Sequence, residues 1–270
     1  MNIKRLRRHW DALGKIDPLW ANLTNDDKRG GKWDAEEFFL TGEQEIEEVT
    51  GFVESLSVTF KHDRALDFGC GVGRLTQALA ARFDDVWGVD IAPSMIELAN
   101  GYNRHPGTCH YYLNDRSDLK RFDDGRFDFI YSNIVLQHMQ PKDQRRYLAE
   151  LVRVLAPGGI FVFQLPSAPL PLPDPKGFGQ RLKLRIKSIT PSMVLVPYRR
   201  LRREVSGLGR GPRMDMWGLP EQEVRDYVAS QGAEIISVTP DRMAFGTGAR
   251  EEARAQDDTC SKLGVVTRTA

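Results

Sequence analysis

The middle of the chain alternates between short apolar runs and amphipathic segments. The apolar runs predict strands at residues 64–68, 85–90, 109–113, 126–132 and 160–165. The segments between them carry the apolar spacing of helices at residues 74–83, 93–102 and 141–155. Near-continuous apolar strands separated by helices are typical of a parallel sheet covered on both faces. Because such crossovers are right-handed, the pattern predicts a doubly wound, mostly parallel α/β sheet.

Before residue 61 the chain does not alternate between apolar strands and helices. An apolar stripe at helical spacing runs through this region, and Asp34 with Glu37 fits the capping box of a helix N-terminus. We therefore expect residues 1–60 to form a helical N-terminal cap. Residues 61–270 are then expected to form the α/β domain.

The alternation also stops after the fifth strand, in the Pro-rich stretch "PSAPLPLPDPKG". It resumes with a helix at 219–233, a strand in "EIISVTP" and a last strand in "SKLGVVTRT". Two strands joined by a loop without a helix imply an antiparallel hairpin at the sheet edge. The expected sheet then has seven strands, with an insertion at about 166–218.

The amino-acid composition is that of an ordinary globular protein and excludes few classes of function. The apolar fraction of 41%, the charged fraction of 28% and the net charge of +1 are ordinary for a globular protein and give no indication of nucleic-acid binding. The three cysteines, Cys70, Cys109 and Cys260, have no CxxC spacing, which suits a reducing compartment. No apolar run approaches the roughly 18 residues that span a bilayer, and no apolar segment follows the basic N-terminus. We therefore expect a cytoplasmic protein.

One segment is strongly basic. Residues 176–213 contain eleven Lys or Arg and one acidic residue, Glu204. Three interpretations stay open for it: a solvated surface, a lid that recruits acidic or phosphorylated acceptors, or a peripheral membrane contact through one amphipathic face.

A glycine-rich loop, "LDFGCGVGR", directly follows the first predicted strand. Glycines allow a sharp turn and close approach of a ligand, and the N-terminus of the next helix offers free N–H groups. The dinucleotide fingerprint would need a further glycine at position 74 or 76, where the chain has Arg74 and Thr76. The loop therefore does not favour NAD.

Four other elements follow in order: Asp90 at the end of the second strand, Asp115 just past the third, "FDFIYSN" and "LAPGGIFVF". An acid about twenty residues past the glycine loop can accept both hydroxyls of a ribose. Together these elements resemble the class I S-adenosylmethionine-dependent methyltransferases. The resemblance covers residues 60–165 well and residues 215–270 more loosely.

The resemblance implies a cofactor site along the strand ends, with S-adenosylmethionine bound and S-adenosylhomocysteine as product. Its residues would be Asp67, Gly69, Cys70, Gly71, Asp90, Ile91, Met95, Asp115, Arg116, Ser132 and Asn133. The glycine-loop residues would hold the methionine end, and Asp90 the ribose. Ile91 and Met95 would pack on the adenine, and Asp115 with the Arg116 backbone would contact its edge. Ser132 and Asn133 would lie under the sulfonium. Core packing remains an alternative for Cys70 and Met95, and helix–strand packing for Gly73.

Motifs of several methyltransferase classes are absent after the fourth predicted strand. The chain has "SNIV" where adenine- and glutamine-modifying enzymes carry [D/N]-P-P-[Y/F], and it lacks the Pro-Cys nucleophile of cytosine C5 enzymes. It also lacks the clustered carboxylates of metal-dependent catechol-type enzymes, so we expect no catalytic metal. "SNIVLQH" resembles small-molecule and sugar O-methyltransferases of bacterial biosynthetic pathways, in which a histidine at this place faces the transferred methyl. His138 is thus the candidate general base, because imidazole titrates near neutral pH.

The resemblance suggests further contacts. "MDMWGLPEQEVRDYVASQGAEIISV" looks like methyltransferases of glycan and polysaccharide synthesis, so Met214, Met216 and Trp217 could line an acceptor slot or simply pack the insertion. The N-terminal cap would place Trp33, Phe39 and Gly42 against the cofactor.

The expected function is methyl transfer to a hydroxyl of a sugar, glycan or similar small metabolite. Two alternatives stay open: an N- or C-methyltransferase of a small metabolite, and a non-catalytic cofactor-binding accessory protein. A nucleic-acid methyltransferase is disfavoured by the near-zero net charge and the missing acceptor motifs.

Overall fold

The computed structural model describes residues 3–167, 216–240 and 261–269. These belong to one of the two compact units into which the chain divides, Met1–Pro169 with Met216–Ala270. The other unit, Leu170–Asp215, lies outside the described residues. The basic segment and Met214 therefore have no structural description here.

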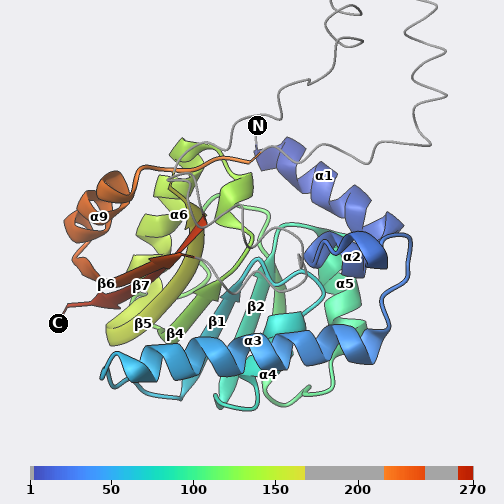
Figure 1. The fold of residues 1–270 in the computed structure, drawn as a ribbon, viewed down its shortest axis with the longest axis horizontal. Helices are drawn as coiled ribbons and strands as arrows, with labels where there is room; N and C mark the ends of the chain where they lie inside the picture. Colours follow the sequence, from blue (N-terminus) through green and yellow to red (C-terminus); the bar gives the residue numbers. More distant parts are fainter. Residues whose placement is uncertain (1–2, 168–215, 241–260, 270) are drawn as a thin grey trace, which may run out of the picture. The chain divides into compact units, whose positions relative to one another are not determined.

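A seven-stranded sheet forms the centre of the described unit, in the order β3-β2-β1-β4-β5-β7-β6 (Figure 1). The strands are β1 (Arg64–Phe68), β2 (Asp85–Asp90), β3 (Cys109–Leu113), β4 (Phe127–Ser132), β5 (Leu155–Pro166), β6 (Ala233–Pro240) and β7 (Ser261–Arg268). Strands β1 to β5 pair in parallel, whereas β7 is antiparallel to both β5 and β6. The predicted doubly wound, mostly parallel sheet and its antiparallel edge hairpin are confirmed.

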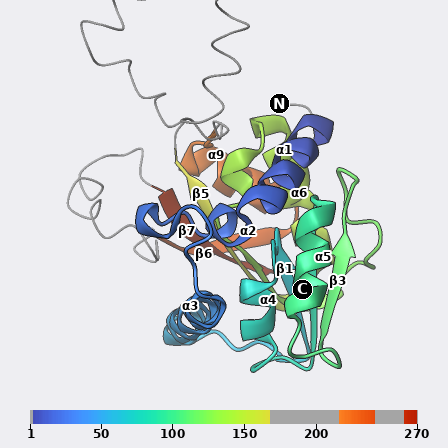
Figure 2. The same cartoon turned by 90° about the vertical axis from the view of Figure 1, so that its right-hand side faces the viewer.

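Helices cover both faces of this sheet. They are α3 (Ala35–Ser55), α4 (Arg74–Leu79), α5 (Pro93–Tyr102), α6 (Pro141–Val154) and α9 (Glu221–Ser230). Alternate strand residues face opposite sides, so Leu66 joins the buried cluster under α6 and α9 while Ala65 joins the cluster under α3 and α4. Figure 2 shows α3 end-on beside α4.

The bounds of three predicted elements are wrong by two residues or more. The predicted helix 219–233 spans only Glu221–Ser230, and Ala233 already begins β6. The predicted helix 74–83 ends at Leu79, and the residues after it form turns in which Ala80 donates back to Thr76. The predicted strand 160–165 begins earlier, at Leu155, because Leu155 already pairs with Phe127 across a register shift in β4. Tertiary pairing decides where β5 begins, whereas the two helices end in local turns before their apolar spacing ends.

The N-terminal residues form α1 (Ile3–Ile16), α2 (Pro18–Asn22), a 3₁₀ turn at Asp26–Lys28 and then α3. The predicted capping box is present, because Asp34 Oδ1 accepts a hydrogen bond from the Glu37 N–H at 3.0 Å. Figure 1 shows α1 and α2 above one end of the strands, with α3 running across them. The domain boundary at residue 60 stays a prediction.

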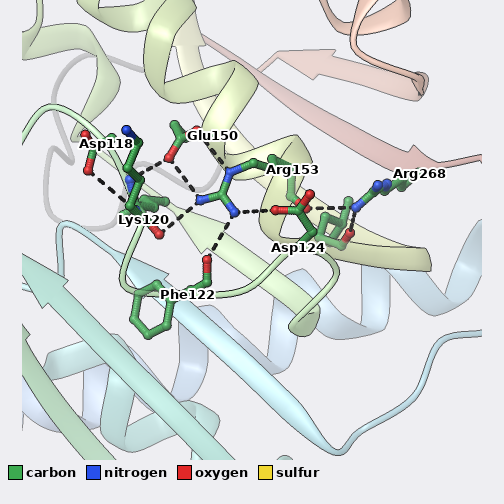
Figure 3. A network of polar contacts seen from close by, with 9 residues as sticks. Asp118, Lys120, Phe122, Asp124, Glu150, Arg153 and Arg268 are labelled. Atoms are coloured by element: carbon green, nitrogen blue, oxygen red, sulfur yellow. Dashed lines mark hydrogen bonds and ion pairs between the residues drawn. The ribbon is translucent and has the colours of Figure 1, made fainter.

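The connection from β3 to β4 contains no helix, and an arginine on α6 anchors it (Figure 3). Arg153 donates to the carbonyl oxygens of Leu119 and Phe122, each at 3.0 Å, and to Asp124 Oδ1 at 2.6 Å. Glu150 accepts from Arg153 Nε at 3.0 Å and from the Leu119 N–H at 2.6 Å. The fork of one guanidinium thus holds the loop against α6.

None of the described helices is long and apolar enough to cross a membrane.

Candidate cofactor and active site

A cavity of about 100 Å³ lies at the carboxyl ends of β1, β2 and β4. This is where ligands bind in open α/β sheets. The core contributes, among others, Gly69, Cys70, Gly71, Arg74, Asp90, Ile91, Met95, Asn114, Asn133, Val135, His138 and Tyr147. The N-terminal helices close it from above with Ile3, Leu6, Trp10, Ala21 and Asn22.

The glycine loop is held close to two other elements. The Gly69 N–H donates to the carbonyl oxygen of Val89 at 2.8 Å. Gly69 and Gly71 have φ of +85° and +52°, and a Cβ at these positions would lie 2.2 Å from Val135 and 1.6 Å from Asn22 respectively. Both positions therefore require glycine by conformation and by space.

Gly73, Cys70 and Met95 each have a packing role as the alternative to a cofactor contact. A Cβ at Gly73 would lie 2.3 Å from the Tyr111 hydroxyl, and its φ is +86°, so close helix–strand packing accounts for this glycine. Cys70 and Met95 are buried and also line the cavity. Burial raises the pKa of the Cys70 thiol, so the thiol stays protonated.

Asp90 is a half-buried acceptor at the cavity wall. Its Oδ2 accepts from the Gly71 N–H at 3.1 Å and its Oδ1 from the Ala92 N–H at 2.7 Å. Burial raises the pKa of this carboxyl group, although the two main-chain donors oppose the shift. The remaining acceptor capacity of Asp90 is suited to the two hydroxyls of a ribose.

A buried polar network forms another part of the wall. Glu45 on α3 accepts from Arg74 Nη2 at 2.7 Å, from the Tyr131 hydroxyl at 2.9 Å and from Asn133 Nδ2 at 2.7 Å. Arg74 also donates to Thr41 Oγ1 at 3.3 Å. Both Arg74 and Asn133 line the cavity. The network therefore connects α3 to the cavity.

His138 follows β4 by six residues and borders the same cavity. It ends a 3₁₀ turn, Leu136–His138, is 6% exposed and lines the cavity. The Trp10 ring meets it edge-on with centroids 5.1 Å apart, and the Gln137 amide nitrogen lies 3.4 Å from its Nε2. Ile134, in the same turn, has φ of 59°, which is strained for a β-branched residue. Such strain is most often found at functional sites.

Several predicted cofactor residues do not line the cavity. Asp67 is fully buried, accepts from Thr76 Oγ1 at 2.6 Å, and has its pKa raised to about 7 by burial. Ser132 is buried and donates to the Phe68 carbonyl oxygen at 3.1 Å. Both side chains are hydrogen-bonded within the loop, helix and strands that border the cavity, and their predicted roles at the cofactor stay predictions.

The residues after β3 are displaced by one position from the prediction. Asp115 is exposed and pairs with Arg7 at 3.5 Å, and the Arg116 carbonyl oxygen accepts from the Tyr147 hydroxyl at 2.6 Å. The cavity is lined instead by Asn114, which is 7% exposed, and by Tyr147.

The predicted acceptor and cap residues lie elsewhere. Met216 and Trp217 do not line the described cavity. Of the cap residues, Trp33 Nε1 donates to the Leu23 carbonyl oxygen at 3.2 Å, Phe39 packs on Tyr102, and Gly42 lies against Arg74. The cavity is closed by α1 and α2, not by the start of α3.

The sequence prediction missed the contribution of α1. Ile3, Leu6 and Trp10 all line the cavity, and their spacing of three and four residues is that of one helical face. That spacing is visible in "IKRLRRHW" and could have indicated a buried face. Asn22, Arg74 and Asn114 carry no comparable signal, because each depends on contacts between distant segments.

Within the described ranges, no group of three or more His, Cys, Asp and Glu side chains could hold a metal ion.

Comparison with known proteins agrees with this geometry. Residues 66–163 match a family model described as a methyltransferase domain. The chain is 35% identical over 116 residues to the O-methyltransferase cnsE of Penicillium expansum, covering 42% of this chain and 41% of that protein. It is 30% identical over 155 residues to the chloroplastic tocopherol O-methyltransferase of Arabidopsis thaliana, covering 52% and 44% respectively. The chain thus spans less than half the length of these curated relatives.

Among solved structures, the magnesium protoporphyrin IX methyltransferase of Synechocystis PCC 6803 with bound S-adenosylhomocysteine has the same fold. Its TM-score is 0.56 at 16% identity, over 99% of this chain and 100% of that one. Residues 66–163 of this chain therefore resemble a methyltransferase domain, and the chain shares the fold of this solved methyltransferase.

Proposed function

We propose that this protein is an S-adenosylmethionine-dependent methyltransferase that acts on a hydroxyl group of a small molecule. One observation carries the proposal: a single cavity joins the glycine loop, Asp90 and Asn133 to the imidazole of His138. When bound, S-adenosylmethionine supplies an electrophilic methyl group on a sulfonium.

The residues present fit this cofactor. Asp90 offers a carboxylate to the ribose hydroxyls, while the backbone of Gly69 and Gly71 leaves no room for a side chain beside the methionine end. Ile91 and Met95 provide apolar surface for the adenine, and Asn114 a polar contact at its edge. The helices α1 and α2 exclude water from above, which favours alignment of the two reactants.

His138 accepts the proton of the acceptor hydroxyl in this proposal. The imidazole is buried at the cavity wall and packed by Trp10, which limits its orientation. A positioned base of this kind contributes roughly 10²–10⁴-fold to the rate. Methyl transfer itself needs proximity and alignment, which the rigid strand ends supply.

The lining of the cavity supports an acceptor with an apolar or aromatic frame. Ile3, Leu6, Val135 and Met139 line the same cavity as His138. Both curated relatives described above are named O-methyltransferases, and one of them acts on tocopherol. A sugar or glycan acceptor, and with it a role in polysaccharide biosynthesis, stays a prediction; of the residues proposed to contact it, Met216 and Trp217 do not line the described cavity.

Two further expectations remain predictions. A basic lid for acidic or phosphorylated acceptors concerns residues outside the described ranges. A cytoplasmic location is supported by the buried, unpaired thiols of Cys70 and Cys109.

Calorimetric titration with S-adenosylmethionine tests the cofactor, and turnover on a panel of phenols, alcohols and sugars tests the acceptor. His138→Ala is expected to lower kcat by roughly a hundredfold or more while the cofactor Kd changes little. His105→Ala, at an exposed position, is the matched control. A His138→Ala enzyme with near-normal turnover would favour an N- or C-methyltransferase, and cofactor binding without turnover on any acceptor would favour an accessory protein.

A further inference from the structure

The carboxylate of Glu45 reaches the cavity wall from outside the sheet. It lies in the middle of α3, on the helix face that packs against α4, and is 1% exposed. We propose that Glu45 is a positioning residue: it orients the Asn133 amide and the Arg74 guanidinium so that the site prefers the cationic sulfonium of S-adenosylmethionine to the neutral thioether of the product. This inference rests on the proposed function.

The contacts of Glu45 divide between its two oxygens. Oε2 accepts from Arg74 Nη2 at 2.7 Å, and Oε1 accepts from both the Tyr131 hydroxyl at 2.9 Å and Asn133 Nδ2 at 2.7 Å. The exposed fractions of the Arg74 and Glu45 side chains are 5% and 1%, so this is a dry ion pair. Three donors fix the orientation of this buried carboxylate, because a rotation of the group would lengthen or break several of these hydrogen bonds at once.

This arrangement decides which way the Asn133 amide faces. Because Nδ2 donates to Glu45, the amide cannot turn over without placing Oδ1 against a carboxylate oxygen. Asn133 also lines the cavity, and its remaining polar atom is the acceptor Oδ1. The residue that follows, Ile134, is held at φ of 59° with its N–H donated to Gln164 Oε1 at 3.2 Å, which fixes the backbone beside Asn133.

The pairing of charges between Glu45 and Arg74 also favours a cationic ligand. Pairing with Glu45 offsets the positive charge of Arg74, which otherwise would repel a cationic ligand in the same low-dielectric cavity. The Asn133 amide oxygen then favours a positive centre nearby, and the guanidinium, its charge compensated by Glu45, no longer opposes it. The demethylated product lacks that positive centre. Glu45 therefore raises the affinity for S-adenosylmethionine more than the affinity for S-adenosylhomocysteine.

The experiment measures the Kd values of S-adenosylmethionine and S-adenosylhomocysteine by calorimetry, for the wild type and for Glu45→Gln. Glutamine keeps the shape but cannot accept from all three donors. We expect the affinity for S-adenosylmethionine to fall about tenfold or more and that for the product to fall about threefold or less. Glu48→Gln, an exposed position on the same helix, is the matched control and should change neither Kd.

Glu45→Asp provides a second variant in case Glu45→Gln does not fold. Aspartate keeps the charge near Arg74 but is too short to hold Asn133 as well, so the same selective loss is expected. Equal losses for both ligands, or unchanged Kd values with a lower Tm, would show a structural role only and overturn the inference. If the wild type binds neither ligand, the proposed function fails instead.

Discussion

Two arginine-centred networks of this protein use the same chemistry in different surroundings. Arg74 is 5% exposed, pairs with a carboxylate that is 1% exposed, and borders the cavity. Arg153 is 26% exposed and pairs with Asp124, which is 71% exposed, at a loop that does not line the cavity (Figure 3). The partners also differ, since Arg153 donates to two backbone carbonyl oxygens and Arg74 to side chains only.

The difference shows that burial decides what an ion pair does. At Arg153, water can replace a lost donor, so the network fastens a loop that has no helix of its own. At Arg74, the paired side chains are 5% and 1% exposed, so water cannot readily replace a lost partner and each group depends on the others for its orientation. A buried pair next to a ligand site is therefore sensitive both in stability and in binding.

The largest effect is expected for Arg74→Met. It leaves Glu45 as an unpaired buried carboxylate, which typically costs about 3–5 kcal/mol of the free energy of unfolding. Urea denaturation measures the loss. Removing both partners in Glu45→Met with Arg74→Met should recover much of the stability but not the affinity for S-adenosylmethionine. A double variant that binds the cofactor normally would contradict a positioning role for this network.

The next effect concerns Asp67, which lies behind the same network. Burial raises its pKa from 3.8 to about 7, so the folded protein holds a proton that the unfolded chain releases above pH 4. The stability from this group is fully present below about pH 4 and is lost as the pH rises through about 7, on the order of 2–4 kcal/mol in total. Asp67→Asn should remove this dependence.

The free energy of unfolding of wild type and Asp67→Asn, compared by urea denaturation from pH 4 to pH 8, checks this prediction. The difference between the two should change in favour of the variant as the pH rises. A difference that stays constant over this range would mean that Asp67 is ionised throughout in the folded state.

The smallest effect is expected for Arg153→Met. Partial exposure limits the loss to about 1–2 kcal/mol, since water can solvate the freed carbonyl oxygens of Leu119 and Phe122. The cofactor Kd should stay within about threefold of the wild type. Arg146→Met, on the same helix and 54% exposed, is the control and should change stability by less than about 0.5 kcal/mol. Loss of cofactor binding in Arg153→Met would remove the distinction between the two networks.

Local patterns predicted much of the sheet. The strands at 64–68, 85–90 and 109–113 and the helix at 93–102 have the predicted bounds, because each is a short apolar run or a helix with Pro at its start. At the end of β3, Asn114 lines the cavity whereas the predicted Asp115 is exposed, because side chains alternate at a strand end and a one-residue offset reverses their direction.

The sequence by itself determined the α/β class, the place of the glycine loop and the acid at Asp90, since these depend on neighbours along the chain. Only the tertiary structure decided what encloses the site. It placed α1 over the cavity, tied Asp67 and Ser132 into hydrogen bonds within the elements that border it, and brought Glu45 to Asn133 across 88 residues of chain. Such contacts depend on which helix faces which strand, and residue spacing carries no record of that choice.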